Sequence, residues 1–357
     1  EVVGTLAVGQ HAEAVGQMKG DDGYPWWHLA DDGWVRADVV RAEEGCQAGS
    51  LSPQVWIDQA RDRLTVGRAF LEGIADGSWH EGFNYQGYLL SMSLPFWTAL
   101  RQLTGVDLIP HTYLRNYVYW WLYNLLPDDE GVLMSFGNLD AGWVNNRQPY
   151  GVLRFIAQEY QCGQAEWLTR QLLGAQGRDS NVYTAPWYVF EYLYYNPTIA
   201  PQPPTDLPGS RVFPDLSAVI WRTGWGENDL IFGLKAGPHG GRFAFDTFVR
   251  ERFPWETPCR ETHCQLNVGH DHEDTNTFYV YQGGWLAPEN AEVGRQETSY
   301  HNTLLIDGQG QYEPSSDRSW RYPADFSGSD GFLEATVSSP HFDFLAADAT
   351  RRYRQIK

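Results

Sequence analysis

The spacing of hydrophobic residues divides the chain into three parts. In residues 1–48, short apolar runs are separated by glycine and aspartate clusters, a pattern typical of short strands joined by tight turns. Within residues 53–200, apolar side chains recur every three or four positions, which predicts a series of amphipathic helices. Residues 209–357 return to short apolar segments bounded by turn signals, which predicts antiparallel strands.

The helical part is interrupted by proline and glycine. Helical periodicity covers residues 56–74, 84–104, 114–125, 147–160, 164–175 and 184–195. Successive helices joined by short loops favour a helical array or an incomplete (α/α) toroid. The stretch 197–208 holds five prolines, which cannot continue a helix, and so marks a boundary. The fold class we expect is multidomain α+β, in which the partial toroid is followed by an antiparallel β-sheet or sandwich domain and preceded by a small β module.

Composition and charge restrict the classes of molecule that the protein could bind. The 357 residues suffice for two or three domains, and 42% of them are hydrophobic. The formal net charge of -19 argues against nucleic acid and against anionic membrane surfaces, which attract clustered lysine and arginine. No apolar run approaches the roughly 20 residues of a membrane-spanning helix. Aromatic residues make up 15% of the chain, which fits stacking on sugars but also fits an ordinary core.

One stretch, residues 267–278, is unusually rich in chemistry-bearing side chains. It holds two histidines, three carboxylates and two amides. In extended backbone, residues two apart face the same side, so His270 and His272 could serve one pocket. Together with the downstream Glu289 and His301 they could bind a divalent metal or take part in catalysis. The alternative is a surface loop with solvated histidines, and spacing alone does not separate the two.

A family resemblance rests on several motifs in order. Residues 267–278, 286–289 and 301–310 resemble the β-domain signature of the heparinase II/III-like polysaccharide lyases and the related dermatan-sulfate epimerases. Upstream, residues 76–88 are similar to the helical-domain motif of that family, and residues 136–140 to a following loop. The resemblance covers roughly residues 55–357. The N-terminal residues 1–48 resemble a bacterial SH3-like module that lacks its usual first strand.

The resemblance implies a reaction and a set of residues. Lyases of this family cleave uronic-acid polysaccharides by β-elimination, which removes the C5 proton beside the carboxylate and breaks the O4 bond. The resemblance aligns Tyr85 with the catalytic tyrosine of the family and His270 with its partner acid or base. His272, Glu289 and His301 fall on metal ligands, with zinc bracing the loop rather than attacking substrate. The family more often has aspartate where Glu289 stands, a change that keeps an oxygen ligand.

Polar residues beside these motifs are candidates for binding substrate. They are His80, Glu81, Asn145, Asn146, Arg147 and Arg242. Each has an ordinary structural alternative: Glu81 could cap its helix, His80 could lie on the surface, and Arg242 could form a structural ion pair. Tyr88, three positions beyond Tyr85, is a rival for the tyrosine role.

One feature of the family has no clear counterpart. Its lyases carry an asparagine or histidine that masks the uronate carboxylate, in helices well before the tyrosine motif. Only about twenty residues separate that motif from the SH3-like segment here, so the first half of a toroid is missing. We expect a longer natural protein, or another segment or subunit that completes the toroid. Otherwise His80, Asn84 or Arg147 takes the masking role, or activity is lost.

The sequence therefore predicts a secreted or periplasmic bacterial lyase acting on an anionic uronic-acid polysaccharide, either alginate or a glycosaminoglycan. The first alternative is a uronyl C5-epimerase, which would return the proton to the opposite face without bond cleavage. The second is a non-catalytic protein that binds carbohydrate or cell wall through its SH3-like module and aromatic surface.

Overall fold

The structure is a computed structural model. It describes residues 12–19, 25–30, 33–36, 64–127, 131–134, 136–138, 149–177, 187–249, 266–267, 270–288, 296–312, 319–320, 329–339 and 341–356. The chain divides into two compact units, Glu1–Gly67 and Arg68–Lys357. The helical motifs and the β motifs of the sequence fall together in the second unit.

The first unit contains a three-stranded antiparallel sheet. Its strands β1 (Ala14–Lys19), β2 (Pro25–Leu29) and β3 (Trp34–Arg36) pair in chain order. The ring of His28 stacks on that of Trp34, with 4.5 Å between ring centroids. Short strands are confirmed for these residues, whereas the SH3-like identity of the module remains a prediction.

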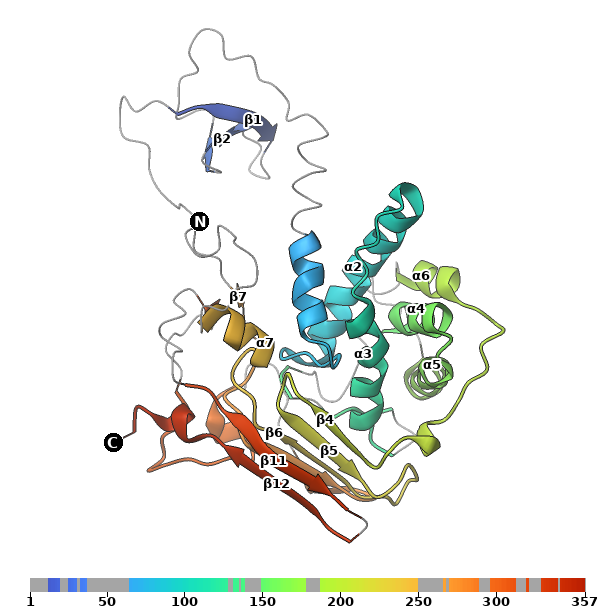
Figure 1. Cartoon of the computed structure of the whole chain (residues 1–357), viewed down its shortest axis with the longest axis vertical. Helices are drawn as coiled ribbons and strands as arrows, with labels where there is room; N and C mark the ends of the chain where they lie inside the picture. The colour runs from blue at the N-terminus through green and yellow to red at the C-terminus, as the bar shows by residue number, and fades with distance from the viewer. Residues whose placement is uncertain are drawn as a thin grey trace. The chain divides into compact units, whose positions relative to one another are not determined.

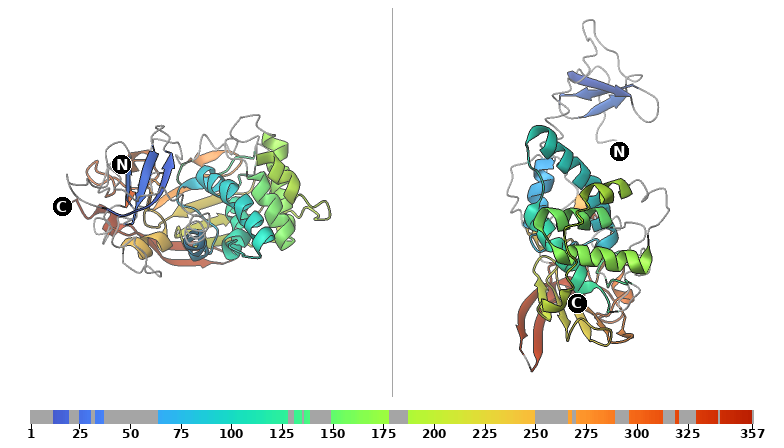
Figure 2. Two further views of the ribbon diagram at one scale, coloured as in Figure 1. Left: turned by 90° about the horizontal axis from the view of Figure 1, so that it is seen from above. Right: turned by 90° about the vertical axis from the view of Figure 1, so that its right-hand side faces the viewer.

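In the second unit the longer helices gather on one side and the strands on the other (Figures 1 and 2). A helix that includes residues 64–73 is followed by α2 (Gly82–Thr104), α3 (His111–Asn124), α4 (Tyr150–Tyr160), α5 (Gly163–Gln176) and α6 (Tyr188–Tyr194). α4 packs against α5 and α6, and also contacts α2 and α3. The α/α toroid predicted for these helices remains a prediction.

Aromatic side chains build the core of the helical side. Tyr113, Tyr117, Trp120 and Trp121 of α3 are all fully buried. Phe83 at the start of α2 meets Trp121 edge-on, with 4.7 Å between ring centroids. Burial of such large rings is a major source of stability. Packing therefore accounts for these aromatic residues, which is the ordinary alternative to a sugar-stacking role.

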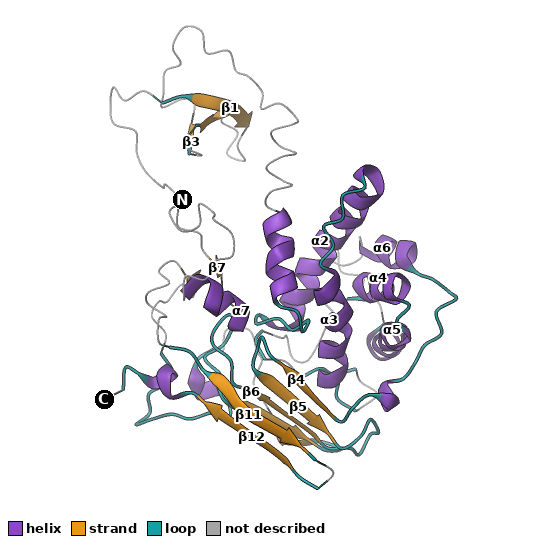
Figure 3. Cartoon of the chain, in the orientation of Figure 1, coloured by secondary structure: helices purple, strands orange, loops and turns teal. Residues whose placement is uncertain are grey.

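The strands form antiparallel sheets (Figure 3). The largest has the order β4-β5-β6-β8-β9 and comprises β4 (Ser210–Phe213), β5 (Ala218–Arg222), β6 (Ile231–Lys235), β8 (Thr277–Tyr281) and β9 (Trp285–Ala287). β11 (Phe332–Ser338) pairs with β12 (Asp343–Asp348), β7 (Leu266–Asn267) pairs with β10 (Ser319–Trp320), and the short α7 (Arg242–Ala244) follows β6. The fold class is therefore α+β, as the sequence predicts.

Buried contacts join α3 to this sheet. Trp120 lies edge-on to Phe213 of β4, with 4.8 Å between ring centroids. The hydroxyl of Tyr279 on β8 donates to Asn124 Oδ1 at 3.0 Å. Arg222 on β5 donates through Nη1 to the carbonyl oxygens of Tyr123 and Leu125, at the carboxyl end of the helix. These carbonyls lack helical partners, so the arginine satisfies them and fixes α3 on the sheet.

The turn before α2 is held from both sides. The Asp76 carboxylate accepts from the backbone nitrogen and the hydroxyl of Ser78, and its other oxygen accepts from the backbone nitrogen of Asp215 at 2.7 Å. Gly77 has φ of 78°, and a Cβ atom there would overlap the backbone of Asn116 in α3. Only glycine fits such a position. The start of α2 is thereby fixed against both the sheet side and α3.

Candidate active site

Tyr85 and His270 lie face to face. Tyr85 belongs to the first turn of α2, and His270 belongs to the segment that precedes β8. Their ring centroids are 3.6 Å apart and the rings are 11° from parallel. Both side chains are half-buried, whereas Tyr88 is exposed. The structure thus brings together the two residues predicted to be catalytic and sets the rival tyrosine apart from them.

Asn138 connects the two histidines of the motif. Its side-chain nitrogen lies 2.9 Å from His270 Nδ1, and its side-chain oxygen lies 2.6 Å from His272 Nε2. The backbone nitrogen of Asn138 donates to the carbonyl oxygen of His270 at 3.1 Å. Gln296 Nε2 also approaches Asn138 Oδ1, at 3.4 Å. One asparagine therefore holds both imidazoles and the backbone between them.

The neighbouring Gly137 explains why the asparagine can reach this place. Gly137 has φ of 95°, and a Cβ atom there would overlap the carbonyl oxygen of His80 and lie 2.8 Å from the nitrogen of Gly82. No larger residue fits a positive φ against backbone this close. The loop thus docks directly on the segment that begins α2, which sets Asn138 opposite the histidines.

Beneath the histidines lies a fully buried charge cluster. Asp271 lies between the two histidines in sequence, and its Oδ1 accepts from Lys235 Nζ at 2.7 Å. Lys235 also donates to Asp274 Oδ1 at 2.8 Å, while the backbone nitrogen of Gly240 donates to Asp271 Oδ2. Burial alone would raise the pKa of Asp271, but the adjacent Lys235 ammonium holds it below its usual range. This ionised carboxylate anchors the backbone that carries both histidines.

The protonation of His270 follows from its surroundings. Burial lowers the pKa of His270, because desolvation disfavours the charged imidazolium. Its imidazole is therefore neutral at pH 7, the form in which a ring nitrogen can accept a proton or a hydrogen bond.

His80 and Glu81 occupy the turn that leads into α2. His80 is buried and its ring lies 4.8 Å from that of Trp79, measured between centroids. Glu81 accepts from Trp79 Nε1 at 3.2 Å. Burial raises the pKa of Glu81 to about 7, a rise that the Trp79 bond opposes and the charge of Asp271 supports. A carboxyl group with such a pKa can exchange protons near neutrality, and Glu81 precedes α2 directly, four residues before Tyr85.

His272 and His301 fit two ligands of one metal ion. Both are buried, with 5.0 Å between their ring centroids. Two imidazoles that share a tetrahedral zinc through Zn–N bonds of about 2.0–2.1 Å place their ring centres roughly 5 Å apart. Because His272 Nε2 bonds to Asn138, Nδ1 would be its coordinating nitrogen. The described residues hold no cluster of three or more metal-binding side chains, and Glu289, the third predicted ligand, lies outside them.

Among the other predicted substrate-binding residues, the structure describes only Arg242. Arg242 donates through Nη2 to the carbonyl oxygen of Gly331, and its Nη1 lies 3.7 Å from Asp330 Oδ2. These contacts match the structural alternative weighed for Arg242. Asn145, Asn146 and Arg147 lie outside the described residues, so their roles stay predictions.

Asn138, Gln296 and Lys235 have roles that the sequence interpretation did not assign. The sequence does indicate that Lys235 needs a partner, because it ends an otherwise apolar strand, where burial of an unpaired charge would cost free energy. Asn138 belongs to a motif that resembles a family loop, but its type and spacing do not indicate a link between two distant histidines. Gln296 carried no signal.

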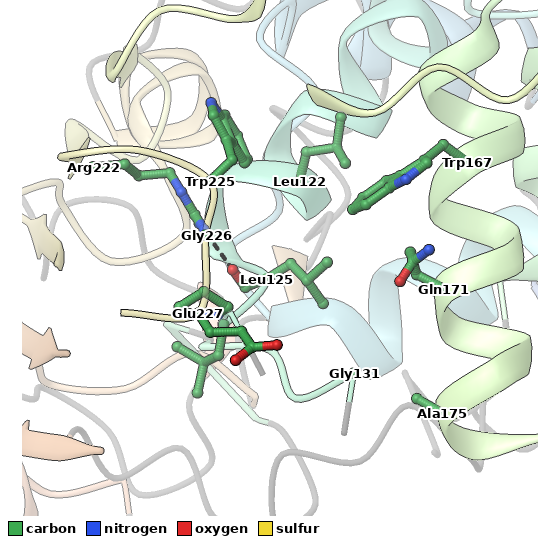
Figure 4. Close-up of a pocket in the computed structure, with 12 residues that line it drawn as sticks. Leu122, Leu125, Gly131, Trp167, Gln171, Ala175, Arg222, Trp225, Gly226 and Glu227 are labelled. Carbon is green, nitrogen blue, oxygen red and sulfur yellow. Dashed lines mark hydrogen bonds between the residues drawn. The ribbon is translucent and has the colours of Figure 1, made fainter. Parts of the chain in front are cut away.

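A separate pocket of about 310 Å³ lies between α3, α5 and the turn that follows β5 (Figure 4). Trp167 and Trp225 stand on opposite sides of it, with Leu122 and Leu125 between them. Gln171 and Glu227 add polar groups to its lining, together with other residues drawn in the figure. None of the predicted site residues that the structure describes lines this pocket.

Comparison with solved structures found neighbours of low sequence identity. No family model matches the chain. A heparinase III with methylated lysines aligns with TM-score 0.43 and 14% identity over 81% of this chain and 37% of its own. A mutant of the heparan sulfate lyase HepC from Pedobacter heparinus aligns with TM-score 0.43 and 15% identity, over 81% and 38%. Another heparinase III aligns with TM-score 0.43 and 12% identity, over 81% and 39%. The chain thus spans less than two fifths of these structures, and its function must be inferred from its own side chains.

Proposed function

We propose that this chain carries the acid–base site of a polysaccharide lyase that cleaves a uronic-acid polymer by β-elimination. The observation that carries the proposal is the face-to-face pairing of Tyr85 with a neutral His270, from two segments far apart in the sequence. Both side chains are half-buried, so a ligand can reach them while part of the surrounding water is excluded.

The reaction needs two proton transfers on neighbouring atoms. The C5–H bond breaks and its electrons form the C4–C5 double bond, while the C4–O4 bond breaks and O4 receives a proton. A base must therefore reach C5 and an acid must reach O4. A phenol and an imidazole in contact can supply both roles. Glu81, with its pKa near 7, offers a further proton store within the same helix turn.

The proposal includes a zinc ion with a structural role. His272, His301 and Glu289 would hold it, and when bound it would fix the loop that carries His270. The predicted polymer is alginate or a glycosaminoglycan, and a secreted or periplasmic location in a bacterium suits such a substrate. Among the described residues, no helix is both long and apolar enough to cross a membrane.

The test is a panel of uronate polymers: alginate, heparan, chondroitin, dermatan and hyaluronan. The expected result is a rise in ultraviolet absorbance with one of them, because only elimination makes a 4,5-unsaturated uronate. A flat trace with deuterium uptake at C5 from heavy water would replace the lyase with a C5-epimerase. A flat trace without deuterium uptake, but with sugar binding, would support the non-catalytic alternative.

A further inference from the structure

The Asn138 side chain offers a donor on one side and an acceptor on the other. An amide nitrogen can only donate and an amide oxygen can only accept. The nitrogen faces His270 Nδ1 at 2.9 Å, and the oxygen faces His272 Nε2 at 2.6 Å. If the amide keeps this orientation, His270 Nδ1 must accept and His272 Nε2 must donate.

A contact from Gln296 is consistent with this orientation of the Asn138 amide. Gln296 Nε2 donates to Asn138 Oδ1 at 3.4 Å, on the same oxygen that accepts from His272. A reversed Asn138 amide would require the Gln296 amide to reverse as well. In addition, the backbone nitrogen of Asn138 donates to the carbonyl oxygen of His270, which holds the two residues in register.

The tautomers follow from these bonds. In a neutral imidazole one nitrogen carries the proton and the other accepts. His270, which accepts at Nδ1, then carries its proton on Nε2. His272, which donates from Nε2, then has its lone pair on Nδ1. Asn138 thus couples the tautomer of His270, which lies beside Tyr85, to the tautomer of His272, a predicted metal ligand.

We propose that Asn138 is a positioning residue that holds His270 in the Nε2–H tautomer and ties it to His272. The role in catalysis rests on the proposed function, whereas the tautomers do not. His270 then presents an N–H group at Nε2 rather than a lone pair. It would donate a hydrogen bond to a substrate oxygen, and Tyr85 would be the group that takes the C5 proton.

The test reads the ring nitrogens directly. The protein labelled with ¹⁵N-histidine is examined by long-range ¹H–¹⁵N correlation, which distinguishes protonated from lone-pair nitrogens, and His270→Gln assigns the signal. The wild type should show His270 fully as Nε2–H. In Asn138→Asp the carboxylate can only accept, so His270 should change to Nδ1–H or to the doubly protonated ring. A wild type with Nδ1–H, or an Asn138→Asp variant that keeps Nε2–H, would overturn the proposal.

A matched control is Asn124→Asp. Asn124 is also buried, and it donates to the carbonyl oxygen of Trp120 and accepts from Tyr279. The same substitution there should lower stability but leave the His270 signals unchanged. A change of tautomer in this control would also overturn the proposal. Because the spectra are recorded without substrate, an inactive protein with these tautomers would refute the lyase and leave the role of Asn138 intact.

Discussion

The imidazole of His270 lies flat against the phenol ring of Tyr85, 3.6 Å away between centroids. One comes from the segment before β8 and the other from the first turn of α2. Two features hold them there: the Asp76 turn fixes α2 against the sheet side, and the buried Lys235–Asp271 pair fixes the backbone under His270. Each feature can be removed without touching the pair itself.

Gly137→Ala should displace the Asn138 loop. The added methyl group would overlap the His80 carbonyl oxygen at a φ of 95°, so we expect a loss of more than about 2 kcal/mol of unfolding free energy. Gly105→Ala is the control, because its φ is 76° but nothing lies within 4 Å of the added atom. It should cost only about 1 kcal/mol. Equal losses in urea denaturation would contradict this account of the loop.

Lys235→Met should be strongly destabilising. It leaves two buried carboxylates, Asp271 and Asp274, without their cation, a change that typically costs about 3–5 kcal/mol. The exposed Lys19→Met serves as a control and should change stability by less than about 0.5 kcal/mol. Chemical denaturation at pH 7 measures both variants. A loss below about 1 kcal/mol in Lys235→Met would show that the cluster is not held as described.

Glu81 should make stability fall as pH rises towards 7. Its folded pKa of about 7 exceeds the value in the unfolded chain, so the folded state binds more protons between roughly pH 4.5 and 7 and loses stability across that window. Glu81→Gln removes this titration and should be more stable than the wild type above pH 7, by on the order of 2 kcal/mol. Melting curves from pH 4 to 8 provide the measurement. Parallel profiles for the two proteins would contradict the raised pKa.

Zinc binding should depend on both buried histidines. In a chelator-buffered titration, His272→Ala and His301→Ala should each weaken zinc affinity by more than the roughly 10–100-fold typical of outer-shell changes. His111→Ala is the control, since that ring bonds to Tyr160 and Asp107 instead. Absence of zinc binding to the wild type would remove the metal from the account, while leaving the Tyr85–His270 pair unaffected.

Periodicity predicted the elements well, because local patterns determine them. The helix expected over residues 84–104 is α2, and the strand expected over 277–281 is β8. The pattern predicted that this helix continues past Pro95, and α2 does contain that proline. Boundaries shifted by a few residues where a helix begins after a proline, as α4 does after Pro149.

The arrangement of the site was less accessible to sequence reasoning. The resemblance placed Tyr85 and His270 in one site, but no local pattern shows that Asn138 bridges two histidines more than a hundred positions away. The same holds for Lys235, whose two partners lie in the histidine segment. Such contacts depend on how the loops dock, and they leave no periodic trace in the chain.

The central claim is that Tyr85, paired with His270, moves protons in a β-elimination. The most direct measurement is the initial rate of ultraviolet absorbance on the most responsive uronate polymer, comparing Tyr85→Phe with Tyr88→Phe. The two changes are identical, one turn apart on α2, but only Tyr85 lies against His270. The account predicts a loss of about 10²–10⁴-fold for Tyr85→Phe and near wild-type rates for Tyr88→Phe. Wild-type rates in Tyr85→Phe would contradict it.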